Sequence, residues 1–190
     1  LCGLFVVGVY VNWVGTAMLT LYLTWSPWHY TGQNYGIAVM FLRRRGVALS
    51  DDTKRWLYAS FILSYILLFF VMHGRESGAV TGNPFYENGG VHLAYLGIPQ
   101  GIAGIAIPVV GVAYLIALGV TWTRLLRVGT MKELLPVAML CLTQALWFSI
   151  PEAARYWGAH AGLDVINFDY RTYYFSWIVF SHAIQYLWIT

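Results

Sequence analysis

The chain has 190 residues, of which 59% are hydrophobic and only 10% carry a charge, and its mean hydropathy is +0.61. An ordinary soluble domain carries about 25% charged residues, so this composition excludes that class and indicates a membrane protein. The formal net charge of +3 is small, and it gives no reason to expect a nucleic-acid partner. The lipid bilayer is the partner that the composition predicts.

Five apolar segments are long enough to cross a bilayer, whose hydrocarbon core of about 30 Å needs about 20 helical residues. They are residues 1–25, 56–72, 98–122, 134–150 and 173–190. None carries a full charge in its middle, and none alternates as a barrel strand would. We therefore predict an all-α fold, a polytopic transmembrane helix bundle in which residues 1–190 form a single domain. Because the chain begins and ends inside apolar runs, we expect it to be a piece of a longer protein.

The stretch SPWHYTGQNYG, residues 26–36, comes directly after the first segment and interrupts the apolar pattern. Pro27 disfavours a continuous helix, and the apolar residues that follow end in three arginines at 43–45. Residues 30–42 are too few to span a bilayer, so we predict an interfacial or re-entrant helix that lies along the headgroups. The alternative is one kinked helix that continues past Pro27.

Lysine and arginine residues predict the orientation of the chain. The loops 43–55 and 124–132 hold eight of them, whereas the opposite loops hold only Arg75, Arg155 and Arg171. Short loops with excess positive charge stay in the cytoplasm, so we expect both basic loops on the cytoplasmic side.

Two His–Gln pairs are the candidate ligands of a metal or haem centre. His29 and Gln33 are four residues apart, and His182 and Gln185 are three apart, so each pair lies on one face of a helix. Imidazole is a common ligand of haem iron, copper and iron, and a neighbouring amide orients the ring. We expect His29 and His182 to bind the centre near the cytoplasmic side, oriented by Gln33 and Gln185. The alternative is structural, with each pair holding helices together by hydrogen bonds.

A second set of polar residues lies near the outer end of the fourth segment. Gln144 and Glu152 are two turns apart and suggest a polar path for protons or for a quinol headgroup. The alternative is that Glu152 only forms a local ion pair with Arg155, three residues further along the chain.

The remaining histidines and the cysteines predict no further site. His73, His92 and His160 fall at or beyond the outer boundary, where we expect solvated loop residues; the alternative is a site built from them. Cys2 and Cys141 lie in apolar runs without a paired pattern, which is typical of buried small side chains.

Glycines in the third segment repeat at helical spacing. They are Gly97, Gly101, Gly104 and Gly111. Small residues on one helix face let another helix approach closely in a membrane, so we expect this face to pack within the bundle; the functional alternative is a cavity beside it.

Three classes of function fit these patterns. The first is a membrane protein with a His-ligated iron, copper or haem centre, active in redox chemistry on a lipid-soluble small molecule; its catalytic residues are unknown. The second is a non-catalytic accessory subunit that contacts other membrane subunits of a larger complex. The third is a transporter, although the sequence shows no inverted repeat.

Overall fold

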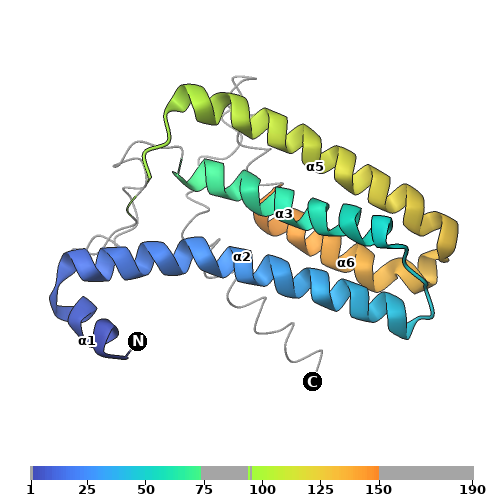
Figure 1. Ribbon diagram of the computed structural model, residues 1–190, viewed down its shortest axis with the longest axis horizontal. Helices are drawn as coiled ribbons and strands as arrows, with labels where there is room; N and C mark the ends of the chain where they lie inside the picture. Colours follow the sequence, from blue (N-terminus) through green and yellow to red (C-terminus); the bar gives the residue numbers. More distant parts are fainter. Residues whose placement is uncertain (1, 74–93, 95, 150–190) are drawn as a thin grey trace.

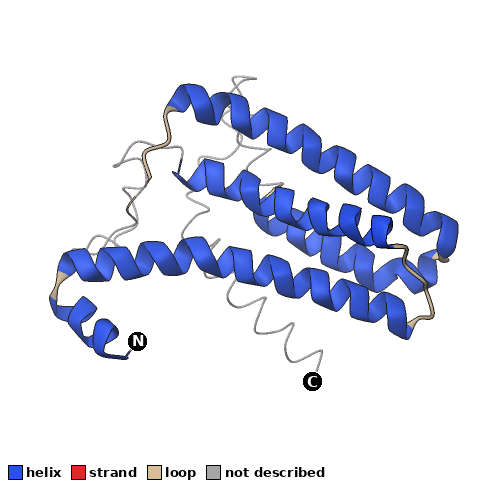
Figure 2. Cartoon of the chain, viewed as in Figure 1, coloured by secondary structure: helices blue, strands red, loops and turns tan. Residues whose placement is uncertain are grey.

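A computed structural model describes residues 2–73, 94 and 96–149, and Figure 1 shows how their helices are arranged. The elements are α1 (Cys2–Tyr10), α2 (Asn12–Arg44), α3 (Asp51–His73), α5 (Gln100–Val128) and α6 (Met131–Phe148). Short loops join α1 to α2, α2 to α3 and α5 to α6, and the described residues contain no strand (Figure 2). The predicted all-α fold is therefore confirmed for the described residues.

Three of the described helices are long and apolar enough to cross a membrane: α3, α5 and α6. They correspond to the predicted segments 56–72, 98–122 and 134–150, and each is longer than predicted at the end nearer a basic loop. The predicted segment 173–190 lies outside the described residues. The protein is thus a helical protein with membrane-spanning character, and the count of five spans remains a prediction.

Helix α3 is the central element of the bundle. It contacts α2, α5 and α6, whereas α2 packs on α3 and α6. The largest apolar cluster joins these helices near the basic loops, and it includes Leu42 of α2, Leu57 and Phe61 of α3, Leu125 of α5 and Leu134 of α6. Contacts within this cluster hold α2, α3, α5 and α6 in position relative to one another along the bundle.

The prediction of a separate helix at residues 30–42 is wrong, because α2 continues through Pro27 as one helix of 33 residues. Proline removes one backbone N–H, and in an apolar surrounding the rest of the backbone still gains by keeping its hydrogen bonds within the helix. One turn further along the helix, the Thr31 hydroxyl donates to the Pro27 carbonyl at 2.7 Å. The continuation of the helix past Pro27, which the alternative above predicted, is observed.

The predicted first span, residues 1–25, is also wrong as a single helix. Val11 has extended backbone between α1 and α2, and α1 folds back against the start of α2 (Figure 1). The two helices meet at glycines: a Cβ placed on Gly8 would lie 3.4 Å from the Gly15 Cα and 3.2 Å from the Met18 Sδ. A side chain at Gly8 would therefore press against the Met18 side chain and the Gly15 backbone.

Candidate functional site

A buried cluster of uncharged polar side chains joins three helices in the interior of the bundle. Gln144 of α6 is at its centre and is only 2% exposed. Its Oε1 accepts from the Asn34 Nδ2 at 2.8 Å. Its Nε2 donates to the Thr31 Oγ1 at 2.9 Å and to the Ser64 Oγ at 3.0 Å. We call these four residues the polar core.

Local helix structure determines the direction of each of these hydrogen bonds. Thr31 and Asn34 are three residues apart on α2, so they lie on the same inner face. The hydroxyls of Thr31 and Ser64 donate to the carbonyls of Pro27 and Phe61 in their own helices. Each hydroxyl oxygen is therefore left as an acceptor for Gln144. An apolar interior strengthens such bonds and makes an unpaired polar group costly.

The polar path predicted from Gln144 and Glu152 stays a prediction. Gln144 is buried and hydrogen-bonded across helices, but its partners are neutral side chains that fix helix positions. Glu152, the other predicted member, lies outside the described residues. Thr31, Asn34 and Ser64 were not predicted from the sequence. The spacing of Thr31 and Asn34 within the polar stretch was the available signal, because it places both on one helix face.

His29 lies on the outer side of α2. Its ring is exposed and stacks on Trp25, with 4.9 Å between the ring centroids and 17° between the planes. The helix continues past Pro27, so Gln33 follows one turn later on the neighbouring surface, as the spacing predicted. Gln33 itself is partly buried. His182 and Gln185 lie outside the described residues, so a shared centre stays a prediction.

The depth of His29 differs from the expected position beside the basic loops. Arg44, at the end of α2, is 15 residues away, which corresponds to about 22 Å along a helix. In the other direction, Thr24 is only five residues away and contacts His73 at the far end of α3. His29 is therefore closer to the bundle end opposite the basic loops.

His73 is not the solvated loop residue that the sequence suggested. It is the last residue of α3 and only 1% exposed. Its Nδ1 accepts from the Leu96 backbone N–H at 3.4 Å, so its Nε2 carries the proton and donates to the Thr24 Oγ1 at 3.0 Å. The Tyr65 hydroxyl donates to the Thr24 carbonyl at 3.1 Å. These contacts join α2 to the end of α3, which gives His73 a structural role. His92 and His160 lie outside the described residues.

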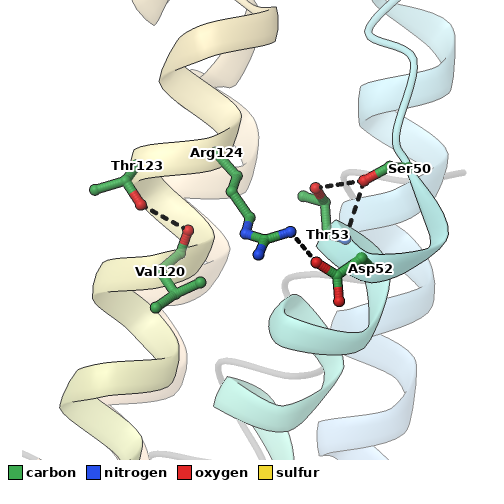
Figure 3. A network of polar contacts seen from close by, with 6 residues as sticks. All are labelled: Ser50, Asp52, Thr53, Val120, Thr123 and Arg124. Carbon is green, nitrogen blue, oxygen red and sulfur yellow. Dashed lines mark hydrogen bonds and ion pairs between the residues drawn. The ribbon is translucent and has the colours of Figure 1, made fainter.

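Both basic loops lie at the same end of the bundle, as predicted. Arg124 of α5 forms an ion pair with Asp52 of α3 (Figure 3). The guanidinium of Arg45 donates to the Lys132 carbonyl at 3.3 Å, which joins the end of α2 to the start of α6. Beside the ion pair, the Ser50 hydroxyl oxygen accepts from the Thr53 N–H at 3.2 Å and so caps the start of α3. The assignment of this end to the cytoplasm remains a prediction.

The predicted glycine face of α5 does not pack on any described helix. A Cβ placed on Gly101, Gly104 or Gly111 would meet no atom within 4 Å. Gly97 is not part of the face, because it precedes α5 and has a φ of +65°, a conformation that glycine adopts readily. Helix α5 instead turns other residues inward, among them Ala103, Tyr114 and Ala117. The spacing predicted a shared face correctly for three glycines but did not predict its direction.

The described residues contain no group of three or more His, Cys, Asp or Glu side chains that could hold a metal ion. Cys141 is a buried free cysteine that packs with the apolar cluster, as expected. Comparison with protein-family models, with curated proteins and with solved structures finds no match. The function is therefore inferred from the residues and their geometry.

Proposed function

We propose that this protein carries a His-ligated iron, copper or haem centre in the membrane and performs redox chemistry on a lipid-soluble small molecule. His29 is the ligand on α2, His182 is the second ligand, and Gln33 and Gln185 orient the rings or the substrate. The observation that supports this most directly is the exposed imidazole of His29 on a continuous helix, facing away from the polar core.

The buried polar residues support the assignment of His29 as a ligand, because their own hydrogen-bonding groups are already used within the bundle. His73 uses both ring nitrogens in contacts with Thr24 and Leu96. Gln144 uses its carbonyl oxygen and both amide hydrogens within the polar core. His29, in contrast, makes ring contacts with Trp25 and Tyr30 and is exposed toward the surroundings of the bundle. A ligand from the lipid phase or another segment reaches that side of α2 without disturbing the interior.

Metal analysis and absorption spectroscopy of the purified full chain test this proposal. The wild-type protein should contain about one equivalent of iron or copper, with a Soret band if the centre is a haem. His29→Ala and His182→Ala should each remove the centre, since each removes one direct bond to it. His92→Ala is the matched control and should keep it. A wild-type protein without bound metal, or a His29→Ala variant with full occupancy, would refute the proposal.

A role as an accessory subunit of a larger membrane complex is the second candidate, and the outer face of α5 favours it. Gly101, Gly104 and Gly119 lie open on this helix, beside exposed apolar residues such as Ile105 and Ile116. Small residues on an outward face of a membrane helix permit close approach of another helix. Purification from native membranes in a mild detergent tests this role. A stoichiometric partner that Gly104→Leu releases would support it, and a monomer in both cases would exclude it.

A further inference from the structure

The side chain of Asn34 presents a hydrogen-bonding atom that the polar core does not use. Asn34 is 0% exposed and lies on the inner face of α2. Its Nδ2 donates to the Gln144 Oε1 at 2.8 Å. Its Oδ1 is buried and has no hydrogen-bond partner within residues 2–73 and 96–149. A buried amide oxygen without a donor is unfavourable and rare in folded proteins, so this atom points to a bound group.

The orientation of the Asn34 amide follows from the donors around it. If both amides were reversed, the Gln144 oxygen would face Thr31 and Ser64 and would need their hydroxyl hydrogens. Those hydrogens already go to the Pro27 and Phe61 carbonyls at 2.7 Å. If Asn34 alone were reversed, two amide oxygens would face each other at 2.8 Å. The orientation with a free Oδ1 is therefore the one that keeps every other hydrogen bond.

We propose that Asn34 Oδ1 binds a buried water molecule, which makes the polar core a hydrated site. Water is the small ligand that donates to an amide oxygen and still bonds to other polar groups. The surroundings favour water over a larger ligand, because Asn34, Thr31 and Gln144 are all at most 2% exposed. A water molecule bound here brings an exchangeable proton into the interior between α2, α3 and α6.

The site is independent of the centre proposed at His29. Asn34 and His29 belong to the same helix but differ in exposure, with Asn34 buried on the inner face and His29 exposed. Loss of metal from a His29 variant would leave the water in place. Loss of the water would likewise leave the metal ligands intact, so the two proposals can fail separately.

Proton-detected solid-state NMR of the full chain in lipid bilayers tests the proposal. In perdeuterated protein that has been back-exchanged in water, rotating-frame transfer should connect a water signal to the Asn34 side-chain amide. The sign of this transfer separates proximity from chemical exchange. The absence of transfer in the wild-type protein, transfer by exchange alone, or a correlation of the Asn34 carbonyl with a protein donor would overturn the proposal.

Infrared difference spectra in ordinary and ¹⁸O-labelled water provide the matched comparison of variants. The wild-type protein should show an isotope-sensitive O–H band from the bound water. Asn34→Leu should lose this band, because it removes the accepting oxygen. Thr31→Val should keep it, because it removes another member of the polar core but leaves Asn34 Oδ1 in place. A band that persists in a folded Asn34→Leu protein would contradict the assignment.

Discussion

Replacement of Gln144 by leucine is the most direct test of the polar core. Leucine has a similar size and stays apolar in the interior, so the change removes hydrogen bonds with little loss of volume. Three bonds disappear: one from Asn34 and one each to Thr31 and Ser64. The two hydroxyls keep their bonds to their own helix carbonyls, whereas the Asn34 amide loses its partner.

The expected loss in the free energy of unfolding is about 2 kcal/mol. Interhelical hydrogen bonds in membrane proteins contribute about 0.6 kcal/mol on average, so three of them give roughly 2 kcal/mol. A stranded buried amide costs about 1–3 kcal/mol in other proteins, which is the same range. The double variant with Asn34→Leu should be more stable than the sum of the two single changes predicts, because it removes both the stranded group and its partner.

Equilibrium unfolding of the purified chain in mixed detergent micelles measures these values. Thr143→Val is the matched control on the same helix, because its partly exposed hydroxyl donates to the Met139 carbonyl within α6 and not to another described helix; it should change stability by less than about 0.5 kcal/mol. A Gln144→Leu protein as stable as the control would refute the structural role of the core. Strict additivity of the Gln144 and Asn34 changes would show that the two side chains do not interact.

Four further results are expected from the same geometry. Gly8→Leu should lower the free energy of unfolding by about 1–3 kcal/mol, as measured by thermal unfolding, because even its Cβ would contact Met18 and the neighbouring backbone where α1 packs on α2. Gly104→Leu should leave stability unchanged or slightly raised, because a Cβ at that position meets no other atom. A large loss of stability would show that another helix packs against Gly104. Cysteines at Ser50 and Thr130 should react with an impermeant reagent from the same side of the membrane, and opposite labelling would contradict the bundle. Arg124→Gln should lower the melting temperature only slightly, with the difference lost in high salt, because the ion pair is partly exposed.

The sequence predicted α3, α5 and α6 well because each contains a long apolar run with few charged residues. Length and composition are sufficient to recognise such helices. Their ends were less certain: α3 begins at Asp51 rather than near residue 56, because Ser50 accepts from the Thr53 N–H and lets charged residues form the first turn. Capping of this kind depends on local geometry that hydropathy does not include.

The polar stretch was harder to interpret, since a residue type does not reveal which way its side chain points. Pro27 and the polar residues around it suggested a break in the helix. The structure instead keeps the helix and divides the residues between two sides, with Thr31 and Asn34 buried and His29 exposed. The partners that justify this division, Ser64 and Gln144, are 80 residues apart in sequence. Only the three-dimensional arrangement of helices brings them together.

Helix α2 shows how a polar interior changes the relation between hydropathy and position. It runs along the whole of α3, because Thr24 meets His73 at one end and Tyr35 meets Tyr58 nearer the other. Yet α2 is not among the helices that are apolar enough to be recognised as spans. Its polar side chains include those that bond to α3 and α6, so they lower the mean hydropathy without contact with lipid. Such a helix is stabilised by polar contacts with its neighbours, so mean hydropathy alone underestimates how much of it is buried in the bundle.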